Sequence, residues 1–175
     1  MGTYTVGGLK GNKNGGTIDK DHVAATLKHF SGHGQPESGL NTNPALLSER
    51  YLRSSHFYSF QHIIENAQPA GIMASYNEID GVPSHANKWL LTKVLRNEFG
   101  FGGIVISDAG GVIDLVGQHH IARDAKDAAR LAFNAGVNVE ITNGDCYQHL
   151  AELVNENKIT LQDIDSAVYK VLKLK

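Results

Sequence analysis

The stretch "GGIVISDAGG" (102–111) decides the fold class, because an apolar, β-branched run stops abruptly at a carboxylate. Residues 104–106 are typical of a strand that is buried on both faces. Asp108 lies two residues after this run, and the three residues that follow it, Ala109 and two glycines, have small side chains or none. Glycine allows a ligand or another backbone to approach closely. The stretch therefore predicts a buried parallel strand that carries an ionisable group at its carboxyl end.

Similar apolar runs recur along the chain and alternate with longer stretches of helical periodicity. The other runs are 22–30, 70–76 and 136–142, and the helical stretches are 46–67, 87–99, 122–135, 145–157 and 160–174. Glycines follow the second and third helical stretches, where they favour helix ends. Thr160 and Asp163 have the spacing of a capping box. This alternation predicts an α/β fold built from βα units around a parallel sheet.

The number of units predicts an incomplete barrel. A closed (β/α)8 barrel needs eight strands and about 250 residues, whereas this chain has 175 residues and four candidate strands. We expect a single partial (β/α) barrel domain over 1–175, with 1–20 as a flexible or helical lead-in. Unpaired strand edges are templates for pairing. We therefore expect completion of the half-barrel by a homodimer or by a complementing chain.

Composition excludes several classes of protein. Sixteen Lys and Arg against 18 Asp and Glu give a net charge of −2, which argues against nucleic acid as a partner and against a polybasic membrane module. No apolar stretch approaches the roughly 20 residues that span a bilayer, and the N-terminus lacks the pattern of a signal peptide. The localisation stays unknown. Cys146 is the only cysteine, which excludes an internal disulfide and a cysteine metal cluster.

Polar residues gather where the apolar runs end. They are Lys28 and His29, Tyr76 and Asn77, Asp108, and Glu140. The carboxyl ends of parallel strands line the ligand crevice of α/β sheets and barrels. We therefore expect these groups to converge on one face of the molecule and to form a single site.

Two readings of Asp108 stay open on position alone. It is either the N-cap of the following turn or a nucleophile or general base held at a strand end; the glycines favour the second reading. His29 and His33 are four residues apart, but glycines and a proline between and after them disfavour a helix. We therefore expect no metal and no cofactor. His119 and His120 are expected to be ordinary exposed loop residues.

Four segments together resemble glycoside hydrolase family 3, the β-glucosidase-type enzymes. They are "HVAATLKHFSGHG" (22–34), "IMASYNEIDGVPSHAN" (72–87), "LLTKVLRNEFGFGGIVISD" (90–108) and "AARLAFNAGVNVEI" (128–141). They follow the order of the family's motifs and cover nearly the whole chain. The resemblance implies a retaining glycoside hydrolase that cleaves O-glycosyl bonds. It also implies that the chain is the C-terminal half of the family's (β/α)8 barrel domain.

The resemblance also implies roles for single residues. Asp108 matches the catalytic nucleophile, Lys28 and His29 match the pair that holds sugar hydroxyls, and Met73 and Tyr76 match residues that line the same subsite. Members of the family often have an aromatic residue directly after the nucleophile, where this chain has Ala109. An aspartate and an arginine from an earlier half of the family's barrel are missing from this chain.

The acid/base carboxyl of the family usually comes from a downstream domain or a separate loop, so we expect it outside this chain. Within the chain, Glu37 and Glu78 are the candidates on the expected active face. Two functions stay open. The chain is either the nucleophile-bearing half of a β-glucosidase-like enzyme or an inert half-barrel that self-associates. A flavodoxin-like nucleotide binder is disfavoured, because "GLKGNKNGG" (8–16) is no phosphate loop.

Overall fold

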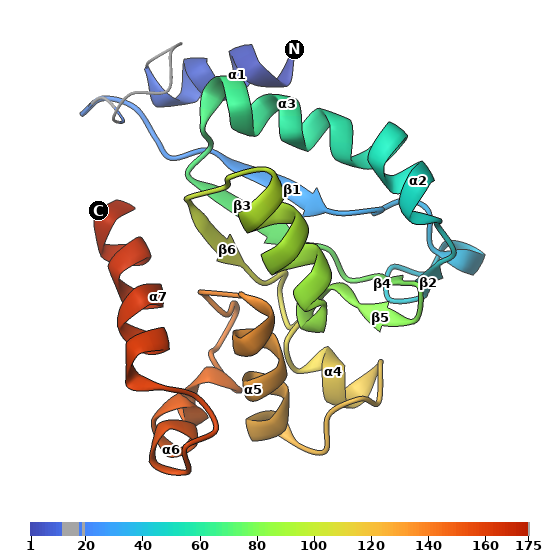
Figure 1. Cartoon of the computed structure of the whole chain (residues 1–175), viewed down its shortest axis with the longest axis vertical. Helices are drawn as coiled ribbons and strands as arrows, with labels where there is room; N and C mark the ends of the chain where they lie inside the picture. The colour runs from blue at the N-terminus through green and yellow to red at the C-terminus, as the bar shows by residue number, and fades with distance from the viewer. Residues whose placement is uncertain (12–17, 19, 175) are drawn as a thin grey trace.

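The computed structural model describes residues 1–11, 18 and 20–174 (Figure 1). In chain order the labelled elements are α1 (Gly2–Lys10), β1 (Thr26–Phe30), β2 (Pro44–Ala45), α2 (Glu49–Tyr51), α3 (Phe57–Ala67), β3 (Gly71–Ala74), β4 (Glu78–Ile79), β5 (Val82–Pro83), β6 (Ile104–Ile106), α4 (Asp114–Gly117), α5 (Ala125–Ala135), α6 (Leu150–Asn155) and α7 (Leu161–Leu174). Two π-helices (Leu52–His56 and Trp89–Glu98) and three 3-10 turns (Glu37–Gly39, Ser84–Ala86 and Tyr147–His149) complete them.

The main sheet is parallel, with strand order β1-β3-β6. Gly71 of β3 pairs with Thr26 of β1 on one side and with Ile104 of β6 on the other. This arrangement confirms the α/β fold class. Each strand lies within a predicted apolar run, and a helical segment follows each of β1, β3 and β6.

The predicted fourth strand is wrong in extent. The run 136–142 forms one parallel bridge with β6, between Ile106 and Val139. Beyond the bridge, Ile141 bonds the side chain of Ser107 and the N–H of Gly110 instead of extending the ladder. The carboxylate of Glu140 accepts N–H groups from Cys146 and Tyr147, so this segment continues as a loop beside the end of β6. Closure into a barrel therefore remains a prediction.

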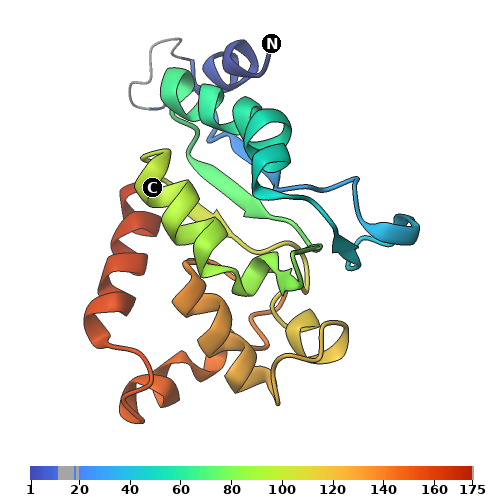
Figure 2. The same cartoon turned by 45° about the vertical axis from the view of Figure 1, so that its right-hand side comes forward.

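One face of the sheet is covered by helices. Ile72, Ala74 and Val105 are fully buried in a core that they share with side chains of α3, the 89–98 helix and α5. Figure 2 shows these three helices following one another along the sheet. Met73 and Ile106, which alternate with the core residues, are only partly buried. The second face of the sheet is therefore less covered than the first, as the inner wall of an open half-barrel would be.

The predicted helix signals are confirmed at their ends. Gly100 and Gly136 have φ of 68° and 114° after the second and third predicted helices. At the start of α7, Asp163 donates its N–H to Oγ1 of Thr160 at 3.1 Å, and Oδ2 of Asp163 accepts the N–H of Thr160 at 3.3 Å. The capping box therefore forms as predicted.

A small second sheet, with order β2-β4-β5, was not predicted. β4 and β5 form a hairpin whose turn residues, Asp80 and Gly81, have φ of 51° and 75°. Asp-Gly is a typical two-residue hairpin turn, because both positions tolerate positive φ. The Asp-Gly turn signal is present in "EIDGVP" (78–83). The flanking strands, however, have only two residues each and are too short to produce an alternating pattern.

The two terminal helices differ in their packing. Val6 of α1 lies in a small cluster with Ala25 and Ala67, so α1 covers α3. The rest of the predicted lead-in and most of "GLKGNKNGG" fall on residues 12–17 and 19, outside the described residues. α7 lies on the flank of the molecule near β6 (Figure 1). It buries only Ala167 and exposes several large apolar side chains: Leu161, Val168, Tyr169 and Leu172.

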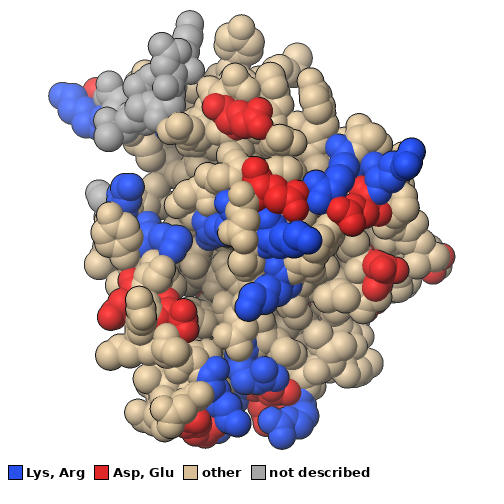
Figure 3. Space-filling view, in the orientation of Figure 1, with Lys and Arg blue, Asp and Glu red and all other residues tan. Residues whose placement is uncertain are grey.

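The surface carries charges of both signs. Figure 3 shows Lys and Arg interspersed with Asp and Glu over one face of the molecule. Among the helices of the described residues, none has the length and apolar content needed to cross a bilayer.

Candidate active site

The backbone at the end of β6 is held by the segment that follows α5. Ser107 donates its N–H to the carbonyl of Val139 at 2.9 Å, and its Oγ accepts the N–H of Ile141 at 2.9 Å. Gly110 donates its N–H to the carbonyl of Ile141 at 2.9 Å. These bonds lie on both sides of Asp108, so its main chain has little freedom to move.

The two carboxylate oxygens of Asp108 have different surroundings. Oδ1 accepts the N–H of Ala109 at 2.8 Å. Oδ2 is buried and accepts no hydrogen bond from the described residues, although Nε2 of His29 lies 3.2 Å away. A turn over residues 109–113 follows Asp108 directly, and helix α4 begins at Asp114, so Oδ1 acts at the start of this turn and not at the helix. One oxygen is therefore fixed, and the other keeps its lone pairs for a ligand.

His29 lies beside this carboxylate at the end of β1. Burial lowers the pKa of His29, the charge of Asp108 raises it, and His33 and Lys28 lower it further. The ring of His33 lies 4.3 Å from that of His29, centroid to centroid. The side chain of Lys28 is exposed. No group of three potential ligands that could hold a metal ion occurs in the part of the chain that the structure describes.

Tyr76 and Met73 reach the same end of the sheet from β3. The hydroxyl of Tyr76 donates to the carbonyl of Ala109 at 2.7 Å. Burial, reinforced by the charge of Asp108, raises the pKa of Tyr76 to about 12. Met73 pairs in register with Ile106, two residues before Asp108. The structure therefore brings His29, Tyr76 and Asp108 together, with Met73 on the neighbouring strand.

Two of the expected strand-end groups do not join this cluster. Nδ2 of Asn77 donates to the carbonyls of Ser31 and Glu78, and the side chain is buried. Glu140 uses both carboxylate oxygens on the N–H groups of Cys146 and Tyr147. The expectation that all strand-end groups converge is therefore wrong for these two, because their polar atoms bind neighbouring loops. Cys146 is itself fully buried, and burial raises the pKa of its thiol to about 12.

A histidine that sequence reasoning missed contacts the candidate nucleophile directly. Nε2 of His85 accepts the backbone N–H of Asp108 at 3.0 Å. The side chain is fully buried, and burial lowers its pKa to about 4, with Asp108 acting in the opposite direction and His119 in the same one. A Cβ atom on Gly111 would lie 2.3 Å from Cε1 of the His85 ring. At Gly111 the space that was expected to admit a ligand is therefore filled by His85.

A second buried histidine lies close by. Nδ1 of His119 lies 2.9 Å from Oε1 of Glu78, and the His119 side chain is only 2% exposed. The expectation of an ordinary exposed histidine is thus wrong for His119. Burial raises the pKa of Asp114, and His119 lowers it. Neither His85 nor His119 lies in a periodic segment, so periodicity gave no signal of their burial.

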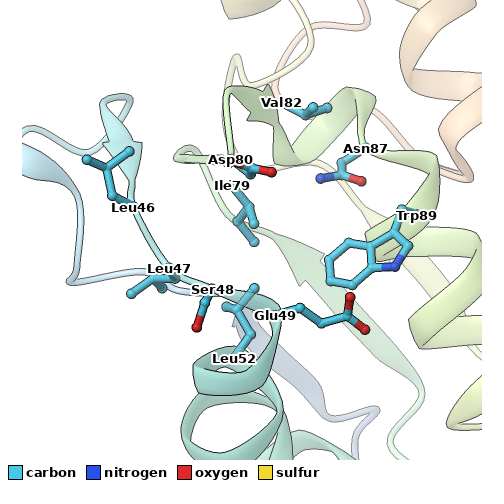
Figure 4. A pocket seen from close by; sticks show the side chains of 10 residues that line it. All are labelled: Leu46, Leu47, Ser48, Glu49, Leu52, Ile79, Asp80, Val82, Asn87 and Trp89. Atoms are coloured by element: carbon cyan, nitrogen blue, oxygen red, sulfur yellow. The ribbon is translucent and has the colours of Figure 1, made fainter.

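Two cavities lie apart from this cluster. One, of about 490 Å³, is formed between residues 46–52, the β4–β5 hairpin and Trp89 (Figure 4). Its polar groups include Glu49, Asp80 and Asn87. The other, of about 1110 Å³, is a groove at the amino ends of the strands, opposite the end that carries Asp108. Neither is lined by Asp108, His29 or Tyr76. The candidate site is therefore the cluster of polar groups at the strand ends, because catalysis requires reactive groups as well as space.

Comparison with known proteins identifies the family. Residues 1–174 match the family described as "Glycosyl hydrolase family 3 N terminal domain". The chain therefore belongs to glycoside hydrolase family 3, and the resemblance noted from its sequence is confirmed.

Its relatives are much longer than the chain. It is 33% identical over 182 residues to a beta-xylosidase of Formosa agariphila and 31% identical over 175 residues to the periplasmic beta-glucosidase of Salmonella typhimurium. Both alignments cover the whole chain but only 25% and 22% of those proteins. A solved beta-glucosidase of Listeria innocua in complex with isofagomine has a TM-score of 0.92 and 34% identity, over 99% of this chain and 24% of that one. The chain thus spans about a quarter of the length of these relatives.

Proposed function

We propose that this chain is the nucleophile-bearing half of the catalytic barrel of a retaining β-glucosidase-like glycoside hydrolase. The observation that carries the proposal is Oδ2 of Asp108, which is buried at a strand end and accepts no hydrogen bond from the described residues. A carboxylate oxygen in this state is available for attack on an anomeric carbon. The attack forms a covalent glycosyl-enzyme, and the leaving oxygen takes a proton from a second carboxyl group.

The neighbours of Asp108 suit the sugar-binding roles that the family implies. His29 lies 3.2 Å from the attacking oxygen, and burial lowers the pKa of its ring, which favours the uncharged form; either form can hydrogen-bond a hydroxyl. Lys28 adds a donor with positive charge next to it. Met73 and Tyr76 form the wall from β3, and Ala109 contributes no aromatic surface for stacking.

We propose that the acid/base lies outside this chain. Retaining enzymes hold their two carboxyl groups about 5–5.5 Å apart. Of the two candidates within the chain, Glu78 is already bound to His119. Glu37 lies in a 3-10 turn on the exposed loop after β1. The relatives' additional length leaves room for a donor from another segment.

The site also depends on completion of the barrel. We propose that a second copy of this chain, or a complementing half, pairs with the open edges of the sheet and covers its partly exposed face. The relatives described above are glycosidases. The enzymatic reading is therefore favoured over an inert half-barrel.

The test is covalent labelling of the 175-residue chain by an activated 2-deoxy-2-fluoroglucoside, followed by peptide mass spectrometry. We expect one glycosyl adduct on Asp108, because the fluorine slows both formation and hydrolysis of the glycosyl-enzyme, whereas the activated leaving group speeds only its formation. An adduct on Glu78 or Glu140 would contradict the assignment of the nucleophile. No adduct, with the fold intact, would favour the inert half-barrel.

A further inference from the structure

We propose that His85 is a positioning residue that fixes the nucleophile by accepting the backbone N–H of Asp108 on Nε2. The inference rests on the proposed function, because it assigns a role beside the same carboxylate. His85 lies in the 3-10 turn Ser84–Ala86, far from β6 in the sequence and in direct contact with it in space.

His85 gives the backbone N–H of Asp108 a hydrogen-bond acceptor just beyond the end of β6. Ser107 donates its N–H to Val139, and Ala109 donates its N–H to the Asp108 carboxylate itself. The N–H of Asp108 lies between them, and buried N–H groups require an acceptor. His85 provides it at 3.0 Å. The imidazole of His85 therefore anchors the backbone at Asp108, and the N–H of Ala109 fixes the orientation of the carboxylate.

Only one form of the imidazole can make this bond. A ring nitrogen accepts a hydrogen bond only when it carries no proton, so the His85 proton must reside on Nδ1, which is buried and has no hydrogen-bond partner among the described residues. A doubly protonated ring would present a second donor to the Asp108 N–H and break the contact. Full burial favours the neutral ring, and His119 adds to this effect, whereas the charge of Asp108 opposes it.

The ring is also held sterically. Gly111 lies so close to His85 that a Cβ atom there would be 2.4 Å from Nε2. Gly111 therefore leaves room for the ring of His85, the residue that positions Asp108. On the other side, His119 is bound to Glu78, which fixes the second buried ring beside the first.

The first measurement needs no variant and no activity. In the chain labelled with ¹⁵N, we expect a scalar coupling across the hydrogen bond between the Asp108 amide nitrogen and Nε2 of His85. The chemical shifts should report an unprotonated Nε2 and a protonated Nδ1 from pH 5.5 to pH 8. An imidazolium at pH 7, or the opposite tautomer, would overturn the inference.

The second measurement separates positioning from simple packing. His85→Gln keeps an acceptor near the position of Nε2, whereas His85→Met has a similar volume and no acceptor. We expect the labelling rate of Asp108 to fall about 10–100-fold in His85→Met, because small displacements of a reacting group are costly, and to stay within about threefold of the unaltered chain in His85→Gln. His62→Gln, at an exposed position on α3, is the matched control.

The outcomes distinguish the two proposals. Labelling of Asp108 at equal rates in the unaltered chain and His85→Met would overturn the role of His85 and leave the proposed function standing. Absence of labelling in the unaltered chain would favour the inert half-barrel over the proposed function, and the scalar coupling and the tautomer would then decide the contact of His85 by themselves. If His85→Met does not fold, a loss of rate in His85→Gln as large as about 10-fold would overturn the inference, since the acceptor is retained there.

Discussion

Asp108 differs from an ordinary surface carboxylate in the asymmetry of its two oxygens. Oδ1 is occupied by the N–H of Ala109, and Oδ2 lies near His29 without a hydrogen bond from the described residues. Buried polar atoms are normally paired, so an unpaired one calls for an explanation. A role in bond formation explains it, because a nucleophile must keep a lone pair available.

Substitution of Asp108 tests this explanation. Asp108→Asn is nearly isosteric and keeps an oxygen for the Ala109 N–H, so we expect an unchanged circular dichroism spectrum. Turnover of an aryl glycoside by the assembled site should fall by several orders of magnitude, because the two-step path is lost. Asp165→Asn, on the exposed side of α7, should leave the rate unchanged. Turnover in Asp108→Asn close to that of the unaltered chain would contradict the assignment.

His85 gives stability a specific pH dependence. Its pKa is about 4 in the folded chain and about 6.5 when unfolded. Above pH 6.5 the ring is neutral in both states, so it adds no pH dependence. As the pH is lowered from 6.5 to 4, His85 becomes protonated in the unfolded state but not in the folded state. The free energy of unfolding therefore decreases as the pH is lowered, by about 3 kcal/mol in total.

This effect is measurable by urea unfolding at several pH values. We expect the free energy of unfolding to fall less steeply below pH 6.5 in His85→Gln than in the unaltered chain. His62→Gln should keep the full slope, because the exposed side chain of His62 lies on α3, away from the contact of His85 with Asp108. Equal slopes in His85→Gln and the unaltered chain would mean that His85 carries a proton in the folded state.

Sequence reasoning reached part of this site. Asp108, His29 and Tyr76 were identified because each ends an apolar run, and the structure brings these three together. His85 was missed, because it lies in a short turn and its importance comes from a partner 23 residues away. Gly111 was noticed for the wrong reason, since periodicity and composition cannot reveal what occupies the space beside a glycine.

At the scale of elements, the strands were predictable and their extents were not. β1, β3 and β6 lie inside the predicted runs because buried parallel strands need continuous apolar sequence. The run 136–142 has the same composition but meets β6 at a single bridge. Composition predicts which segments can form strands, whereas the hydrogen bonds that a segment makes with its neighbours decide how far the strand extends.

The cap formed by Glu140 supports a testable prediction. Its carboxylate accepts N–H groups at 3.2 Å from Cys146 and 2.7 Å from Tyr147. Glu140→Ala would leave these donors without that partner, and we expect a loss of about 1–3 kcal/mol in unfolding free energy. Hydrogen exchange of the Cys146 and Tyr147 amides should accelerate. Glu65→Ala, which removes an exposed carboxylate from α3, should change neither; an unaffected Cys146 amide in Glu140→Ala would contradict this account.

At the scale of the whole molecule, the uncovered surfaces are the most informative feature. α7 exposes Tyr169 at 64% and Leu172 at 61%, and β1 has a strand neighbour on one side only among the described residues. At roughly 25 cal/mol per Å², a few hundred Å² of exposed apolar surface amounts to a large part of a domain's stability. We therefore expect the chain to associate.

Sedimentation at micromolar concentration tests this expectation. We expect a species of twice the 18.9 kDa chain mass, about a two-fold axis. Tyr169→Lys combined with Leu172→Lys should shift the chain toward the monomer if α7 lies in the contact. Tyr58→Lys, an equally exposed position on α3, is the control. A compact, stable monomer of the unaltered chain would contradict the pairing of half-barrels.

The burial of Cys146 has a consequence for the chain's response to oxidants. Only the thiolate reacts readily with oxidants and disulfides, and a pKa of about 12 leaves almost none of it near neutral pH. The thiol is also the only one in the sequence and has no exposed surface. In the folded chain the thiol should therefore stay unmodified in both reducing and oxidising surroundings. A thiol reagent would modify Cys146 only as fast as the chain unfolds, so the rate of modification measures the rate of unfolding.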